Sequence, residues 1–210
     1  MGQVPFSTEH EAFWAGDFGD DYVARNSGRG LVAANTALFA KILSTADSVR
    51  SVLELGANIG NNLVALQQLL PDVKLTAVEI NATAARRLAA LAGVTVHNTS
   101  LLEYEPRETH DMTLSKGVLI HIDPARLPDA YDRLYKASHR YICLVEYYNP
   151  TPVSVPYRGN AERLYKRDFA GEMLDRYPDL RLVSYGFSYH RDPTFPQDDA
   201  NWFLLEKRAS

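Results

Sequence analysis

The sequence contains a single cysteine, Cys143, within the apolar run YICLV. One thiol cannot form an intramolecular disulfide, which is typical of proteins in the reducing cytoplasm, and we interpret Cys143 as a small buried hydrophobe. No apolar run approaches the ~20 residues that a membrane-spanning helix needs. The N-terminus also lacks the charged and apolar regions of a secretory signal peptide. We therefore expect a cytoplasmic protein that does not bind a membrane.

The chain also lacks an excess of positive charge, since its formal net charge is −4 at pH 7. This charge argues against a general nucleic-acid binder. The six histidines show no H-x-x-x-H spacing and no cysteine pair accompanies them, so the sequence predicts no metal site. We expect a small-molecule partner and no nucleic acid, and the sequence leaves the oligomeric state open.

Short apolar runs alternate with amphipathic stretches along most of the chain. This alternation predicts an α/β, Rossmann-like fold with a mostly parallel seven-stranded sheet. The last two strands have no helix between them, so we expect a C-terminal antiparallel hairpin at one edge. The predicted strands are 51–56, 74–80, 94–98, 111–117, 140–148, 180–190 and 201–208, and the predicted helices are 30–46, 61–71, 81–93, 123–138 and 166–178.

Helix ends and the N-terminal segment carry further signals. Asn81 is placed to cap the helix at 81–93 and Gly93 to end it, and Pro128 should break or offset the helix at 123–138. Residues 1–29 show neither helical nor strand periodicity. We interpret them as a lid-like segment, in which Trp14 and Phe18 pack, on a single domain (1–210) whose core spans 30–208.

The stretch SVLELGANIGNNL reads as a strand, a glycine-containing turn and the start of a helix. A dinucleotide site needs G-x-G-x-x-G, with glycines where the backbone approaches the pyrophosphate and where the helix packs. Here the run has Gly56 and Gly60, but Asn58 and Asn61 stand at the other two places. This spacing excludes the oxidoreductase interpretation and suits a ligand without phosphates.

Two acidic residues narrow the class of ligand that this turn could bind. Glu54 lies two residues before Gly56, where a carboxylate would repel phosphate but accept a hydrogen bond from an ammonium group. Glu79 ends the second strand, where an acid can bind both hydroxyls of a ribose. A ribose joined to an amino-acid end, without phosphate, describes S-adenosylmethionine (SAM).

These residues resemble the first motif of class I SAM-dependent methyltransferases, E/D-x-G-x-G-x-G. Glu54, Gly56 and Gly60 match it, and Asn58 replaces the central glycine; asparagine tolerates left-handed φ better than most residues. The resemblance implies that Glu79 binds the ribose and that S-adenosylhomocysteine (SAH) is the product. Further cofactor contacts fall on Ser100 and Leu101 in NTSLLEY, which lacks the usual aspartate, and on Lys116 in SKG.

Three further stretches resemble a narrower group, the methylases encoded beside pseudaminic acid biosynthesis. They are FWAGDFGDDYVARN, SKGVLIHIDP and VEYYNPTPVSVPYRGNAERLYKRDF. The resemblance spans nearly the whole chain and implies methylation of a small polar metabolite, such as a nonulosonic-acid sugar or a related intermediate.

Two ionisable residues are candidate catalytic groups, because ligands of such sheets bind at the carboxyl ends of the strands. His121 follows the fourth strand and Glu146 ends the fifth. We expect both to face the methyl group, where either could remove a proton from the acceptor. The alternatives are a helix cap for His121 and a structural anchor for Glu146.

Candidate acceptor-binding residues combine tyrosine, asparagine and basic side chains. Arginine recognises carboxylate or phosphate with two parallel hydrogen bonds, so we expect an anionic acceptor. Solvated surface charge is the alternative for the basic residues. The candidates are Tyr22, Arg25, Asn26, Tyr147, Tyr148, Asn149, Tyr157, Arg158, Lys166 and Arg167.

Two other functions stay open at this point. One is a methyltransferase that acts on a peptide, protein or tRNA, although the low net charge weakens the tRNA version. The other is a non-catalytic SAM-binding protein, which Asn58 and the missing adenine-site aspartate would fit.

Overall fold

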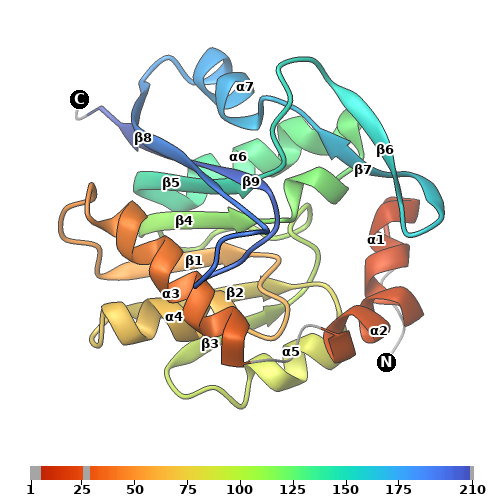
Figure 1. The fold of residues 1–210 in the computed structure, drawn as a ribbon, viewed down its shortest axis with the longest axis horizontal. Coiled ribbons are helices and arrows are strands. Elements are labelled where there is room, and N and C mark those ends of the chain that lie inside the picture. Colours follow the sequence, from red (N-terminus) through yellow and green to blue (C-terminus); the bar gives the residue numbers. More distant parts are fainter. Residues whose placement is uncertain (1–5, 26–28, 209–210) are drawn as a thin grey trace.

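The computed structural model describes residues 6–25 and 29–208. Its main feature is a seven-stranded sheet of order β3-β2-β1-β4-β5-β9-β8 (Figure 1). Strands β1 to β5 run parallel, and β9 pairs antiparallel with both β5 and β8. The predicted fold, including the C-terminal hairpin, is confirmed. The strands are β1 (Ser51–Leu55), β2 (Lys74–Glu79), β3 (Val94–Asn98), β4 (His110–Lys116), β5 (Ser138–Glu146), β8 (Leu180–Ser188) and β9 (Ala200–Lys207).

Helices cover both faces of this sheet (Figure 1). One apolar core joins α3, α4 and α5 to strand residues such as Val52, and the other joins α6 and α7 to residues such as Leu53. Successive strand residues point to opposite faces, so a short apolar run serves both cores. The helices are α3 (Arg29–Leu43), α4 (Asn61–Leu69), α5 (Ala82–Leu88), α6 (Leu127–Ala137) and α7 (Phe169–Arg176).

Asn81 and Pro128 act as predicted, whereas Gly93 does not end its helix. The side chain of Asn81 caps α5 by accepting a hydrogen bond from the Ala84 amide at 2.8 Å. The helix ends at Leu88, before Gly93, which has a φ of 78°. The stretch 123–138 is offset, because a 3₁₀ turn (Pro124–Arg126) precedes α6 and Pro128 lies in the first turn of that helix.

The N-terminal segment differs from the prediction of no regular structure. It forms two short helices, α1 (Glu9–Ala15) and α2 (Asp17–Arg25). Their aromatic residues pack on one another, with the rings of Phe13 and Phe18 stacked at 4.1 Å and Trp14 edge-on to Phe18 at 5.3 Å. Seven and nine residues are too few to show a helical period when contacts across a bend stabilise them.

A second small sheet was also not predicted. Strands β6 (Val153–Tyr157) and β7 (Asn160–Lys166) pair antiparallel outside the main sheet and lie beside α1 (Figure 1). Arg158 and Gly159 connect them with φ values of 48° and 82°, as in a two-residue hairpin turn. Among the described helices, none has the length and apolar character needed to cross a bilayer.

Candidate active site

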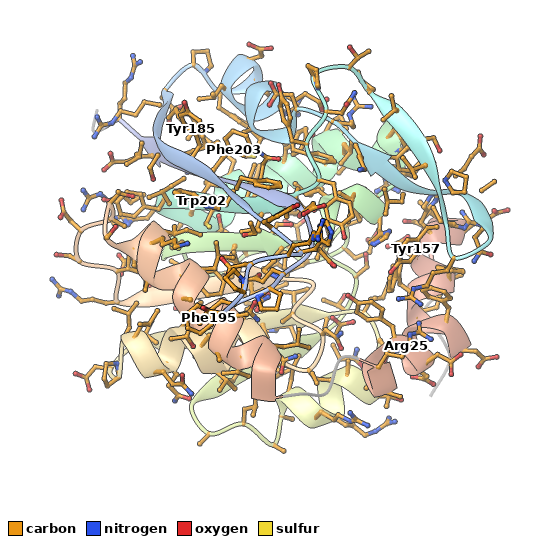
Figure 2. All side chains as sticks on the ribbon, in the orientation of Figure 1. Arg25, Tyr157, Tyr185, Phe195, Trp202 and Phe203 are labelled. Atoms are coloured by element: carbon orange, nitrogen blue, oxygen red, sulfur yellow. The ribbon has the colours of Figure 1, made fainter. Side chains whose placement is uncertain are left out.

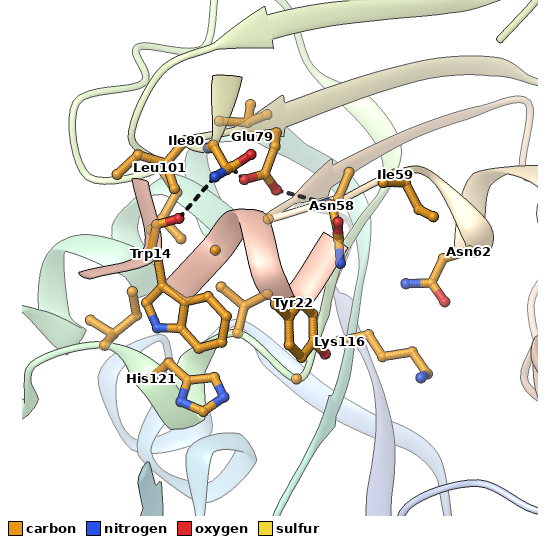
Figure 3. A pocket seen from close by; sticks show the side chains of 18 of the residues that line it. Trp14, Tyr22, Asn58, Ile59, Asn62, Glu79, Ile80, Leu101, Lys116 and His121 are labelled. Carbon is orange, nitrogen blue, oxygen red and sulfur yellow. Dashed lines mark hydrogen bonds between the residues drawn. The ribbon is translucent and has the colours of Figure 1, made fainter. Parts of the chain in front are cut away.

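A cavity of about 490 Å³ opens at the carboxyl ends of β1, β2 and β4. Its floor is formed by the turn after β1, the end of β2 and the segments after β3 and β4 (Figure 3). Helices α1 and α2 and the loop between β8 and β9 close it from the other side. A cavity of this volume, lined by both polar and apolar residues, is typical of a binding site for a small molecule.

The turn after β1 has three residues in left-handed conformation. Gly56, Asn58 and Gly60 have φ values of 78°, 48° and 85°. A Cβ at Gly60 would lie 2.5 Å from the Leu91 side chain, so packing as well as φ requires glycine there. Asn58 takes the conformation that the motif's central glycine would supply. Gly56 and Asn58 line the cavity.

Glu79 lies in the cavity wall with its carboxylate fixed by the backbone. One oxygen accepts a hydrogen bond from the Asn58 amide and the other from the Asn81 amide, both at 2.7 Å (Figure 3). Burial raises the pKa of Glu79, while these amide bonds oppose the rise. Each oxygen keeps a lone pair for a further donor, so the carboxylate can receive two neighbouring hydroxyls.

Glu54 lies behind this wall and is fully buried. One oxygen accepts a hydrogen bond from Nδ2 of Asn62 at 2.6 Å, and the other has no hydrogen-bond partner within residues 6–25 and 29–208. Burial raises the pKa of Glu54 to about 7. Burial also lowers the pKa of Lys116, whereas the nearby Glu54 charge raises it. Lys116 and Asn62 both line the cavity, whereas Glu54 does not and contacts it only through Asn62.

Ser100 and Leu101 line the cavity as expected, but the serine hydroxyl has another partner. Ser100 donates a hydrogen bond to the carboxylate of Glu11 in α1, and its Oγ accepts one from the Leu102 amide at 3.0 Å. Although burial raises the pKa of Glu11, hydrogen bonds from Ser100, Ser7 and Thr8 bring it below its usual value. Ser100 therefore joins α1 to the segment after β3.

His121 lines the cavity from the 3₁₀ turn after β4 (Leu119–His121). Its Nδ1 lies 2.6 Å from the carbonyl oxygen of Arg163. The rings of Trp14 and Tyr157 lie 4.6 and 4.8 Å from the imidazole. Burial lowers the pKa of His121 to about 4, so the ring is neutral near pH 7.

Glu146 does not face the cavity, which corrects the expectation that it would. Its buried carboxylate accepts hydrogen bonds from the Ser115 hydroxyl at 2.7 Å and from the Val118 and Leu119 amides at 3.1 Å. A longer bond of 3.4 Å comes from the Ile120 amide. Glu146 thus anchors the loop that carries His121, which is the structural alternative left open by the sequence.

Of the candidate acceptor-binding residues, only Tyr22 lines the cavity within the described residues, and two arginines lie near it. Tyr22 lines the cavity, and burial raises its pKa to about 12. Arg25 and Arg158 are exposed and do not line the cavity, but their charges act on Tyr22. Figure 2 shows Arg25 and Tyr157 at the side where α1 and α2 meet the small sheet. Asn26 lies outside the described residues.

The remaining candidates are not in the cavity wall. Tyr147 hydrogen-bonds Asp198, and Lys166 lies 5.4 Å from its ring. Arg167 forms an ion pair with Glu172 at 2.7 Å. Tyr148 is exposed near Phe203, and Asn149 donates to the Thr151 carbonyl at 2.5 Å.

Several lining residues were missed by sequence reasoning. Asn62 holds Glu54, Trp14 covers His121, and Asp198 comes from the loop between β8 and β9. Asn62 could have been found, since it is the second residue of the helix that follows the glycine turn. No local sequence pattern identifies Trp14 or Asp198, because contacts with residues far away in the sequence bring them to the cavity.

No protein-family model and no curated protein sequence matches this chain. Solved structures do match it. The 1,6-didemethyltoxoflavin-N1-methyltransferase of Burkholderia thailandensis, with bound 1,6-didemethyltoxoflavin and SAH, has a TM-score of 0.70 at 13% identity over 99% of this chain and 94% of its own. The chain has the class I methyltransferase fold. Magnesium protoporphyrin IX methyltransferase from Synechocystis PCC 6803, with bound SAM, has a TM-score of 0.67 at 12% identity over 98% of this chain and 100% of its own.

A third similar structure is the plantazolicin methyltransferase BpumL in complex with SAH, at a TM-score of 0.67 and 13% identity over 95% of this chain and 94% of its own. These likenesses confirm the predicted fold. Within the described parts of the chain, no three histidine, cysteine or acidic side chains gather as a metal site would require.

Proposed function

We propose that this chain is a SAM-dependent methyltransferase that acts on a small polar, anionic metabolite. The observation that carries the proposal is the Glu79 carboxylate, which two backbone amides fix in the wall of the cavity beside a left-handed glycine turn. A fixed acid at the end of the second strand suits the two ribose hydroxyls of a nucleoside. The likeness to solved methyltransferases supports it as analogy.

The other end of the cavity fits the methionyl part of SAM. Three buried acceptor atoms at this end have no hydrogen-bond partner among the described residues. Asn58 Oδ1 and Asn62 Oδ1 belong to residues that line the cavity, and Glu54 Oε2 lies behind Asn62. Unsatisfied buried acceptors cost free energy, and an ammonium group would supply the missing donors. Lys116, beside Glu54, would hold the carboxylate of the same amino-acid end.

Bound SAM would supply an electrophilic methyl group on a sulfonium. The residues of the chain would hold the acceptor in line with that methyl group and keep water out. Trp14 and Tyr22 from the N-terminal helices lie over the cavity for this purpose (Figure 3).

The anionic character of the acceptor rests on Arg25 and Arg158. Both are exposed and close enough to Tyr22 for their charges to act on its hydroxyl, so they would meet an acceptor at the rim of the cavity. A nonulosonic-acid sugar or a related intermediate, which the sequence resemblance implies, carries such a carboxylate. Replacing either arginine with lysine would test this role through acceptor affinity.

Calorimetry with SAM, SAH and NAD tests the cofactor. Glu79→Ala should weaken SAM binding by about 1.5–3 kcal/mol, the scale of hydrogen bonds to a charged group. Glu108→Ala, at an exposed acid, is the matched control. Unchanged SAM affinity in a folded Glu79→Ala protein, or tighter binding of NAD than of SAM, would contradict the proposal.

Isotopically labelled SAM then tests the reaction. Incubation with a metabolite extract, followed by mass spectrometry, should show the label in a small anionic product. SAM binding without any labelled small molecule would instead favour a non-catalytic SAM-binding protein, and label in peptides or tRNA would change the acceptor class.

A further inference from the structure

The tautomer of His121 is set by the small sheet. The Arg163 carbonyl, 2.6 Å from Nδ1, can only accept, so Nδ1 carries the proton. The other ring nitrogen, Nε2, is then an acceptor. Among the residues that the structure describes, none donates a hydrogen bond to it, and His121 lines the cavity. The cavity thus presents a neutral imidazole with one open lone pair.

Contacts with α1 hold the strand that provides this carbonyl. His10 Nε2 lies 2.9 Å from the Glu162 carbonyl oxygen, and Arg163 reaches Glu9 at 3.3 Å. The Arg163 guanidinium also lies 5.5 Å from the centre of the Phe13 ring. Strand β7 and α1 therefore fix the histidine together, although residues 9–13 and 162–163 are far apart in the sequence.

The surroundings of His121 are aromatic. Trp14 and Tyr157 lie against the imidazole, and Tyr22 stands edge-on to Trp14 at 5.3 Å. Rings arranged in this way favour a flat, unsaturated molecule, which stacks on their faces or meets their edges. Figure 3 shows Trp14 and His121 on one side of the cavity, Asn62 on the other, and Tyr22 between Trp14 and Lys116.

Other side chains near this side are poorer proton acceptors. The Tyr22 pKa of about 12, raised by burial, keeps its hydroxyl protonated. Glu146 is occupied by the loop before His121. Lys116 has a pKa lowered by burial and lies beside Glu54 at the methionyl end. Besides Glu11 and Glu79, four other ionisable residues line the cavity, and each has a partner: His10 the Glu162 carbonyl, His190 the Asp199 carboxylate, Asp123 the Ala125 amide and Asp198 the Tyr147 hydroxyl. Lys116 and these four residues are the alternatives to His121.

We propose that the acceptor is a flat, unsaturated molecule whose methylated atom is an acidic O–H or ring N–H, and that Nε2 of His121 takes its proton. This inference rests on the proposed function and narrows its acceptor. As the acceptor atom forms its bond to the methyl carbon, the carbon–sulfur bond breaks and its electron pair stays on sulfur. The proton moves to Nε2 and then to water, so charge and atoms balance.

The weak basicity of His121 agrees with this class of acceptor. With a pKa of about 4, the imidazole is poorly matched to a saturated sugar hydroxyl, which is a very weak acid. An enol, a phenol or a ring N–H releases its proton more readily. Among anionic acceptors, a flat unsaturated ring therefore suits His121 better than a sugar ring does.

The first test is nitrogen NMR on histidine-labelled protein with SAH bound, using His121→Gln to assign the signals. We expect a protonated Nδ1 and a bare Nε2 from about pH 5.5 to about pH 8.5. A proton on Nε2, or a charged ring near pH 6, would overturn the proposal. Arg163→Ala should increase the Nε2-protonated form because it loosens β7 from α1, and Arg163→Lys should restore part of the native signal.

The second test uses the product labelled from SAM in a metabolite extract. We expect the methyl group on an enol or phenol oxygen or on a ring nitrogen; methylation of sulfur, a carboxylate, a tertiary amine or a saturated alcohol would overturn the proposal. His121→Gln should slow label transfer by about 10²–10⁴-fold while SAH affinity stays within about twofold. If wild type and His121→Gln transfer the label at equal rates while Lys116→Met loses label transfer, the proton goes to Lys116 and the proposal is overturned. Failure to bind SAM would instead refute the proposed function, and the NMR result would still decide the tautomer.

Discussion

The two sides of the cavity are built in different ways. The sheet side consists of the turn after β1, the end of β2 and the segment after β4, and its key groups are bound to backbone amides. The lid side consists of α1, α2 and the loop between β8 and β9. Its residues are more exposed, and side-chain contacts with distant segments hold them. The sheet side is therefore the more firmly fixed part of the site, and we predict that the lid side opens more readily.

Replacing one glutamate on each side should give the largest difference in the free energy of unfolding. Glu146→Ala leaves three backbone amides, two of them buried, and a buried hydroxyl without their acceptor, so we expect a loss of about 3–5 kcal/mol in the free energy of unfolding. Glu9→Ala removes an ion pair to Arg163 whose carboxylate side chain is 89% exposed, and we expect a change within about 0.5 kcal/mol. Urea denaturation measures both, and equal losses would show that the lid side is as firmly fixed as the sheet side.

The sheet side could be predicted because chain geometry determines it. Where a parallel strand ends at the sheet edge, the next residues must lie near the ends of its neighbours. Glu79 and the turn at Gly56 therefore meet in the cavity, as the spacing indicates. The same reasoning placed Glu146 at the correct edge, but it could not show that the carboxylate turns toward the amides after β4.

The lid side could not be predicted because no local period encodes it. Helices α1 and α2 depend on their aromatic contacts, and Asn81 donates to Asp20 at 3.0 Å to attach them to α5. The hairpin that orients His121 was missed, although Arg158 and Gly159 stand where a two-residue turn would lie. Its strands have mixed polarity, so alternation gives little indication of them.

Two glycines with similar backbone conformations sharpen this comparison. Gly60 and Gly159 have φ values of 85° and 82°, so alanine costs about 1–2 kcal/mol at either position from φ alone. At Gly60 the new Cβ would also lie 2.5 Å from Leu91 and 2.8 Å from Leu88, whereas at Gly159 it meets nothing within 4 Å. We expect Gly60→Ala to destabilise by about 2–4 kcal/mol and Gly159→Ala by about 1 kcal/mol. Equal losses in thermal or urea unfolding would show that the turn after β1 accommodates the methyl group.

The smallest expected effect is a pH dependence of SAM affinity that comes from Glu54. Burial raises its pKa to about 7, so the folded protein favours the neutral acid. The contribution of this group to the free energy of unfolding is fully present below the pKa that Glu54 has in the unfolded chain. It is lost as pH rises through about 7. An ammonium group of SAM beside Glu54 would favour the ionised carboxylate. Below about pH 7, SAM binding would therefore release the proton that Glu54 carries in the free protein. We expect SAM affinity to rise by up to about tenfold per unit from about pH 5.5 to about pH 7 and then to level off. Calorimetry in buffers of different ionisation enthalpy measures the released proton. Glu54→Gln should flatten the curve, while Glu108→Gln, at an exposed position, should leave it unchanged. A wild-type affinity that does not vary across this range would place the ammonium group away from Glu54.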